Sequence, residues 1–144
     1  MSSQLIQNKV KEYESFIEDV LKKDLKDIEV KLSKSVGKHG EWEELQTTIA
    51  LLRRFKDREL NLLVPLDCGV SVNAETDDYN RLLVNIGAGC LLELDYDEAH
   101  KYADIRLRIV KKEIDHYRDL AAKVKAKIKI TLLAIDQLSN GSIK

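Results

Sequence analysis

The last third of the chain carries its most regular hydrophobic pattern. From Ala103 to Leu138 apolar and small residues recur in alternating steps of four and three. A seven-residue repeat held this long is typical of a coiled-coil seam, because it keeps one narrow stripe of a helix facing a partner helix. Asp95 is a suitable N-cap and Gly141 a suitable stop, so the pattern predicts a C-terminal helix over residues 96–139. The predicted seam consists of Ala103, Leu107, Val110, Ile114, Tyr117, Ala121, Val124, Ile128, Thr131, Ile135 and Leu138.

A second helical pattern opens the chain. Apolar residues recur in steps of three and four from Ile6 to Phe55, and charged residues of both signs lie between them. Such a pattern indicates an amphipathic helix with one solvated face. Gly37 and Gly40 interrupt it, and a glycine inside a helix costs about 1 kcal/mol relative to alanine. We expect a long helix over residues 4–60 with a soft spot or short break at these two glycines.

The period changes in the middle segment, residues 61–94. Four short runs rich in Leu, Val and Ile lie there, separated by turn residues such as Asp67-Cys68-Gly69 and by a polar loop. Short apolar runs bounded by Gly, Asn and Asp predict strands, most simply paired as two β-hairpins. Pro65 has no N–H to donate, which places its strand at a sheet edge or a bulge.

These elements predict a mainly α fold in one domain, 1–144: a long antiparallel α-helical coiled coil with two central β-hairpins. The hairpins reverse the chain, so the two helices can bury their seams against each other. An isolated hairpin is only marginally stable in water, and its edges attract other strands. We therefore expect other subunits to cover the strands. The predicted subunit interface consists of Leu62, Val64, Leu66, Val70, Val72, Leu82, Val84, Ile86 and Leu92.

Composition narrows the classes of partner. The chain has 144 residues, of which 34% are charged and 44% hydrophobic, and its net charge is −1. A near-neutral chain has no overall field that attracts nucleic acid or anionic lipid. No apolar run approaches the roughly 20 residues of a membrane span, and the N-terminus has no secretory pattern. We expect an intracellular protein with no direct nucleic-acid or membrane contact, whose Cys68 and Cys90 are free thiols.

The sequence offers little catalytic chemistry. Gly87-Ala88-Gly89 lacks the further glycine of a dinucleotide-binding loop, so it predicts a turn or bulge. The three histidines and two cysteines have no zinc-ligand spacing. No nucleophile motif is present, and the carboxylates alternate with Lys and Arg as on solvated helix faces. These observations predict a protein that is not an enzyme and that holds no cofactor or metal.

A local basic run stands out in the C-terminal helix. It consists of Lys123, Lys125, Lys127 and Lys129. Alternate positions spread around a helix, so the run is compatible with a solvated face. The sharper hypothesis is an acidic partner that docks near this half of the helix.

Several motifs of the middle segment are similar to those of a known family. Residues 63–69 (LVPLDCG), residues 84–89 (VNIGAG), Glu93 and residues 97–99 (DEA) resemble the hairpin signature of alpha-class prefoldins. Residues 13–25 (YESFIEDVLKKDL) resemble a prefoldin-like branch that is distinct from the general prefoldin subunits. The similarity extends over nearly the whole chain. It implies a hexamer of two alpha and four beta subunits, in which the hairpins form a β-barrel platform and coiled-coil tentacles hold unfolded clients at their tips.

The resemblance also implies partners and a location. These are beta-class prefoldin subunits, a second alpha-class prefoldin-like subunit of the unconventional prefoldin interactor type, and client or transcription-regulatory proteins. Such a complex associates with a co-chaperone machine that assembles RNA polymerases and kinases. It implies residence in cytoplasm and nucleus, association with the centrosome, and a role as transcription cofactor. If the hairpins lie at the roots of the helices, the chain ends lie near the tips, where Leu5, Ile6, Ile135 and Leu138 are the candidate client contacts.

Two alternatives remain at this point. The chain could be a general prefoldin alpha subunit that delivers unfolded actin and tubulin to a chaperonin. It could also act as a scaffold that holds regulatory proteins on its coiled coil without beta-class subunits. The partners that co-purify with the protein distinguish these possibilities.

Overall fold

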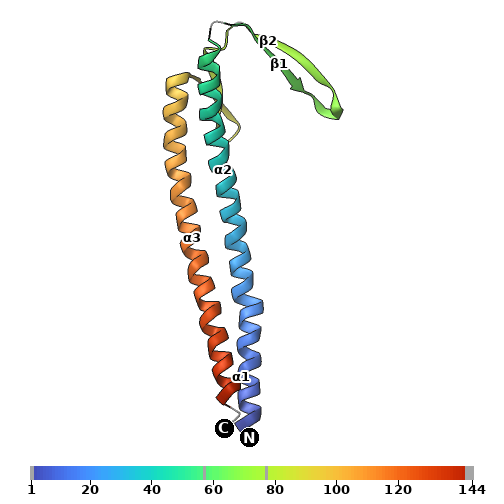
Figure 1. Ribbon diagram of the computed structural model, residues 1–144, viewed down its shortest axis with the longest axis vertical. Coiled ribbons are helices and arrows are strands. Elements are labelled where there is room, and N and C mark those ends of the chain that lie inside the picture. The colour runs from blue at the N-terminus through green and yellow to red at the C-terminus, as the bar shows by residue number, and fades with distance from the viewer. Residues whose placement is uncertain (1, 57, 77, 142–144) are drawn as a thin grey trace. The chain divides into compact units, whose positions relative to one another are not determined.

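The computed structural model describes residues 2–56, 58–76 and 78–141 (Figure 1). Its elements follow in the order helix, two hairpins, helix, which confirms the predicted fold class. The N-terminal helix consists of α1 (Ser2–Phe16), the π-helical turn η1 (Ile17–Leu21) and α2 (Lys22–Arg54). Next come the strands β1 (Leu60–Pro65) and β2 (Ser71–Thr76), joined by the 3₁₀ turn η2 (Asp67–Gly69), and then β3 (Arg81–Gly87) and β4 (Cys90–Asp95). The last helix is α3 (Tyr96–Gly141).

The chain divides into two compact units. The first combines Met1–Lys38 with Val110–Lys144, and the second is His39–Ile109. In the first unit the blue start of α1 lies beside the red end of α3 in Figure 1. Glu29 of α2 approaches Lys125 of α3 at 3.9 Å, and the Ser35 hydroxyl donates to Glu113 at 3.3 Å. Since the residue number rises along α2 as it falls along α3, the two helices run antiparallel.

The seam of the first unit agrees closely with the predicted repeat of α3. Every predicted seam residue of α3 in this unit is buried or half-buried. On the facing helix, Ile17 and Leu21 are buried. The prediction fails at Val36, which is exposed, while the small polar Ser35 is buried in its place. Ser35 continues the spacing from Ile28 and Leu32, and its hydroxyl satisfies its hydrogen-bonding need on Glu113.

A π-helical turn interrupts the N-terminal helix at Ile17–Leu21. Tyr13, Ile17, Leu21 and Leu25 follow one another at three consecutive steps of four, whereas a seven-residue repeat alternates fours and threes. The run therefore contains one residue too many for the seam. A π turn, whose hydrogen bonds span five residues, absorbs the extra residue and keeps Ile17 and Leu21 both buried.

No break occurs at Gly37 and Gly40, so the short break that the sequence allowed is wrong. α2 is α-helical from Lys22 to Arg54. Both glycines are exposed, and apart from the adjacent backbone of the helix nothing lies within 4 Å of the position that a Cβ would occupy. The half-buried residues on either side of them, Leu32 and Trp42, continue the packed stripe. Packing along the helix therefore outweighs a glycine penalty of about 1 kcal/mol at each position.

The first helix is shorter than the predicted 4–60. It ends at Arg54, because Leu60 already pairs with Thr76 in the β1–β2 ladder. Phe55 and Arg58, which follow α2, are held by the buried Tyr79, whose hydroxyl shares its single proton between their two carbonyl oxygens. The Tyr96 hydroxyl in turn donates to the backbone carbonyl of Tyr79.

The core of the second unit lies where α2, α3 and the second hairpin meet. Ile49, Val84 and Ala99 form the buried cluster, and partly buried apolar side chains surround it. Trp42 and Tyr102 make an edge-to-face contact with ring centroids 5.4 Å apart. The Gln46 amide donates to the Asp104 carboxylate at 2.7 Å, a partly buried contact that helps fix the register of the two helices. The surrounding residues are Trp42, Leu45, Leu82, Leu94, Tyr96 and Tyr102.

The start of α3 is fixed by the residue predicted as its N-cap. The Asp95 carboxylate accepts the backbone N–H of Glu98 at 2.8 Å, and the Glu98 carboxylate accepts the backbone N–H of Asp95 at 3.1 Å. This reciprocal pair is a capping box, which satisfies two backbone donors at the helix end. It sets the point where β4 changes into α3.

Candidate subunit interface

The first hairpin has one apolar face that the described chain leaves uncovered. In the β1–β2 register Leu62 pairs with Ala74 and Val64 with Val72, so these side chains point to the same side. Leu66 and Val70 follow at the turn, where the N–H of Leu66 donates to the carbonyl of Val70 at 2.7 Å. All five large side chains of this surface are exposed, namely Leu62, Val64, Leu66, Val70 and Val72. We call this set the hairpin-1 face.

The opposite side of the first hairpin is mostly polar. It carries Asn61 opposite Glu75 and Asn73 opposite Leu63. A two-stranded ribbon with one apolar and one polar face is built to lie on another apolar surface. Burial of apolar surface stabilises a folded protein by about 25 cal/mol per Å². The hairpin-1 face stays exposed in the single chain, so it contributes little of this stabilisation there.

The second hairpin is partly covered by the chain itself. Val84 is only 4% exposed, in the cluster with Ile49 and Ala99, and Leu82 and Leu94 pack around that cluster. Toward the turn the same side opens, and Ile86 and Leu92 remain exposed.

The outer side of the second hairpin is also apolar in its centre. Leu83 is 68% exposed, and Leu91, which pairs with Asn85 on the same face, is exposed as well. Arg81 and Glu93 flank them with an exposed ion pair at 3.6 Å. An apolar centre with a charged rim is the usual composition of a protein–protein interface.

The structure sorts the predicted interface residues into two groups. Leu62, Val64, Leu66, Val70, Val72, Ile86 and Leu92 are exposed on the hairpins. Val84 is buried and Leu82 is half-buried against the chain's own core, so they are less accessible than the others. Strand alternation alone could not tell which side of β3 meets α2 and α3. The predicted set also leaves out Leu63, Leu83 and Leu91, the most exposed large apolar side chains of the hairpins.

Both hairpin turns need backbone conformations with positive φ. Cys68 and Gly69 have φ of 70° and 75°, and Ala88 has φ of 52° between two positive-φ glycines. The ladder shifts register between Asn85 and Gly87, which confirms the predicted turn or bulge at Gly87-Ala88-Gly89. The exposed thiols of Cys68 and Cys90 lie at these turns.

The candidate client contacts lie at the ends of α1 and α3 in the first unit. Leu5 is exposed at 62%, whereas Ile6, Ile135 and Leu138 are half-buried along the seam rather than exposed. A pocket of about 480 Å³ lies beside them, between α1 and the end of α3. Its lining is mixed, with Ser3, Ile6, Gln7, Val10, Lys11, Glu14 and Ser139.

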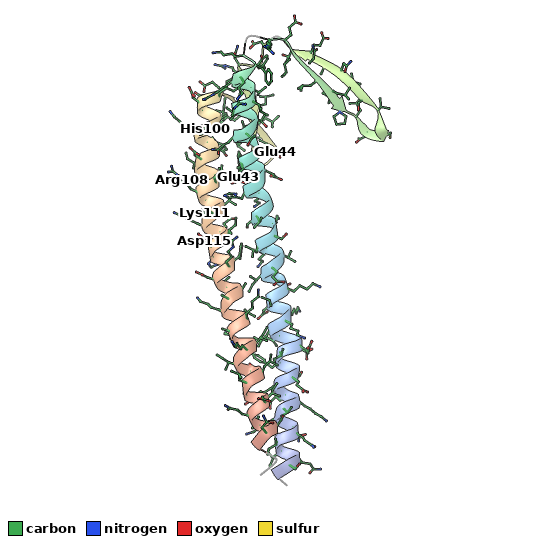
Figure 2. All side chains as sticks on the ribbon, viewed as in Figure 1. Glu43, Glu44, His100, Arg108, Lys111 and Asp115 are labelled. Atoms are coloured by element: carbon green, nitrogen blue, oxygen red, sulfur yellow. The ribbon has the colours of Figure 1, made fainter. Side chains whose placement is uncertain are left out.

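Charged side chains cover the helices without gathering into a reactive cluster. Glu43, Glu44, His100 and Arg108 are exposed on α2 and α3 (Figure 2). In the part of the chain that the structure describes, no group of three His, Cys, Asp or Glu side chains could hold a metal ion. Over those same residues, no helix is long and apolar enough to span a membrane. Burial raises the pKa of the Tyr96 hydroxyl, and Tyr79 and Asp78 raise it further.

Comparison with known proteins decides the family. Residues 38–141 match the family model of the prefoldin subunit. The chain belongs to the prefoldin family. The matched range holds both hairpins and all of α3 as described, which are the elements that form the candidate interface.

This prefoldin subunit matches UXT proteins over about nine tenths of its length. It is 30% identical to Protein UXT of Homo sapiens over 130 residues, covering 90% of this chain and 83% of that protein. It is 27% identical over 135 residues to the Protein UXT homolog of Nematostella vectensis, covering 92% of this chain and 85% of that protein. The match to Prefoldin subunit 5 of Arabidopsis thaliana, at 31% identity, covers only 45% of this chain. The predicted resemblance to a prefoldin-like protein of this kind is therefore confirmed.

A solved prefoldin has the same fold. The similarity is to a chain of filamentous PFD from Methanocaldococcus jannaschii, with a TM-score of 0.66 and 16% sequence identity. It covers 83% of this prefoldin subunit and 98% of that chain. Membership of the family implies assembly with other prefoldin subunits, and members of the family are chaperone-type proteins rather than enzymes.

Proposed function

We propose that this chain is a subunit of a hetero-oligomeric prefoldin-like co-chaperone complex and binds its sister subunits through the hairpins. The hairpin-1 face carries the proposal, because five large apolar side chains on one ribbon face are exposed in the chain by itself. The partners are beta-class prefoldin subunits and a second alpha-class subunit of the unconventional prefoldin interactor type.

Hetero-assembly explains why both hairpins keep open edges. Each sheet of the described chain has only two strands, so both of its strands are edge strands. Unpaired N–H and C=O groups along such edges are satisfied by strands of neighbouring subunits. The apolar centre formed by Leu83 and Leu91 offers a second surface for the same assembly.

The coiled coil supplies the second part of the proposed function. The ends of α1 and α3 hold client or transcription-regulatory proteins, with Leu5 as the exposed apolar contact beside the pocket. A role as transcription cofactor and residence in cytoplasm and nucleus, with centrosome association, belong to the same proposal. They are supported by the similarity to UXT proteins along 90% of the chain.

Native mass spectrometry of the tagged protein purified from its own cells tests the proposed assembly. We expect beta-class subunits and one further alpha-class subunit in a defined stoichiometry, together with polymerase-assembly factors. Recovery of regulatory proteins without any beta-class subunit would reject the complex and leave only a scaffold function.

A general prefoldin alpha subunit that delivers actin and tubulin is the alternative function. The limited match to Prefoldin subunit 5, over 45% of the chain, favours it less than the longer match to UXT proteins. Co-purification with chaperonin and its clients, in place of polymerase-assembly factors, would select this alternative.

A further inference from the structure

A further apolar surface lies on α3, formed by residues that belong to neither the seam nor the hairpins. Ala122, Ala126, Ile130 and Leu133 follow one another at steps of four, four and three, so they share one face of the helix. We call these four residues the outer stripe. Ile130 is 67% exposed and Leu133 is 55% exposed. Their spacing places them on the side of α3 opposite the seam residues Val124, Ile128 and Thr131. Packing within the coiled coil therefore does not explain why these positions are apolar.

The two long sides of the outer stripe carry positive charge, while Asp119 and Asp136 lie beyond its two ends. Lys123 and Lys129 each lie within one helical turn of Ala126, and Lys125 and Lys127 lie farther round the helix. No acidic residue occurs on α3 between Asp119 and Asp136. Lys125 approaches Glu29 at 3.9 Å, whereas Lys123 and Lys129 form no ion pair among residues 2–56, 58–76 and 78–141.

We propose that the outer stripe docks an amphipathic helix of another protein whose apolar side is bordered by Asp or Glu. The two alanines let a helix backbone approach closely, and Ile130 and Leu133 fill the groove between its side chains. Acidic residues on its two borders then meet Lys123 and Lys129. The stripe spans about 17 Å of helix, which matches roughly three turns of a partner.

Charge excludes a second copy of this chain as the occupant. Two outer stripes packed on each other would bring Lys123 and Lys129 of one copy against the same lysines of the other, and like charges in contact disfavour a complex. A membrane surface also fits poorly. The stripe has only two large apolar side chains and no aromatic residue, whereas interfacial helices insert a wide apolar face rich in Trp, Phe and Leu.

This surface goes beyond the proposed assembly function, because it lies on α3 and not on the hairpins. A variant that loses partner-helix binding is therefore expected to keep its sister subunits. Purification of the prefoldin complex from each variant separates a failure of this inference from a failure of the proposed function.

Two designed helical peptides of three heptads serve as probes. Both carry leucines along one stripe, and the stripe is bordered by glutamates in one peptide and by lysines in the other. Fluorescence anisotropy with the full-length chain is expected to show binding of the acidic peptide about tenfold tighter than that of the basic peptide at low salt. The preference should shrink as salt is raised, because exposed charges are screened.

Two pairs of substitutions test the residues of the site. Lys123→Glu with Lys129→Glu should weaken binding of the acidic peptide about tenfold and strengthen binding of the basic peptide. Ile130→Ser with Leu133→Ser should weaken binding of the acidic peptide by a similar factor. Matched controls are Lys111→Glu with Lys112→Glu and Ile105→Ser with Ile109→Ser, which change exposed residues of the same helix outside the stripe. Circular dichroism confirms that each variant keeps its helix content.

Several outcomes would overturn the inference. Equal binding of the two peptides would contradict the proposed docking site. So would control pairs that have the same effect as the stripe pairs. Stronger binding to vesicles of phosphatidylserine and phosphatidylcholine than to the acidic peptide, lost in the Ile130/Leu133 variant, would assign the stripe to membranes. A smaller oligomer for that variant on size-exclusion chromatography would assign it to a second copy.

Discussion

Val64 and Val72 lie directly opposite each other in the β1–β2 hairpin, and both stay exposed, at 40% and 47%. A directly opposed valine pair is the unit that stabilises a sheet, and elsewhere it normally belongs to a covered face. Its exposure here, together with three further large apolar residues on the same face, is the observation that supports the proposed assembly.

Charges placed on that pair should abolish assembly and leave the helices formed. We expect Val64→Asp with Val72→Asp to lose its beta-class partners, because two carboxylates would be buried without a counter-charge. Its helical circular dichroism should stay close to that of the unmodified chain. Size-exclusion chromatography of the co-expressed subunits measures the loss. Asn61→Asp with Asn73→Asp, on the polar side of the same hairpin, is the matched control and should still assemble.

Val84 should respond in a different way, since it is buried within its own chain. Val84→Ala is expected to lower the free energy of unfolding by about 2 kcal/mol, as the loss of methyl groups leaves a cavity beside Ile49 and Ala99. Chemical denaturation at a fixed protein concentration measures the change. Val72→Ala removes the same atoms from an exposed position and should change the isolated chain far less. Equal effects of the two substitutions would contradict the assigned core.

The π turn predicts an unusual tolerance to deletion. Removal of the exposed Val20 should restore alternating steps of four and three between Tyr13 and Leu25, and turn η1 into ordinary α-helix. Thermal unfolding should then begin at a temperature no lower than in the full chain. Removal of the exposed Lys31 from α2 is the control. It shifts the seam by one residue where no extra residue exists, so the midpoint of unfolding should fall sharply.

The two helical glycines offer a test of the unbroken α2. Gly37→Ala and Gly40→Ala should each raise the free energy of unfolding by up to about 1 kcal/mol, because a helical alanine is less costly than a glycine and open space surrounds both positions. Denaturant titration measures the gain. A loss of stability at either position would indicate that the backbone there departs from helical geometry. Gly89→Ala is a contrasting substitution, expected to destabilise because φ is 72° there.

The sequence predicted the elements wherever one period held without interruption. The seam of α3 and the four strands follow directly from steps of seven and from short apolar runs between turn residues. The predictions failed where two weak effects competed. At Gly37 and Gly40 the low helix propensity of glycine is outweighed by the packing of residues on either side. At Ile17–Leu21 three consecutive steps of four indicate the π turn. Each step of four is normal in a helix, so only the unbroken run of three such steps carries this signal.

The apolar strands were predictable as a segment, whereas the exposure of their single side chains was not. The apolar strands indicated a surface for partners, and the exposure of Leu62, Val64 and Val72 agrees with that indication. Alternation in β3 specifies two faces but not which of them meets the helices. Val84 was therefore assigned to the interface, and Leu83, on the other face, was left out.

The assembly state of the purified chain tests the central claim most directly. Sedimentation velocity is measured for the full-length protein alone and after addition of purified beta-class prefoldin subunits. We predict a self-associating or polydisperse protein alone and one discrete hetero-oligomer after mixing, because the hairpin-1 face must be covered. A stable monodisperse monomer that stays monomeric beside the beta-class subunits would contradict the account.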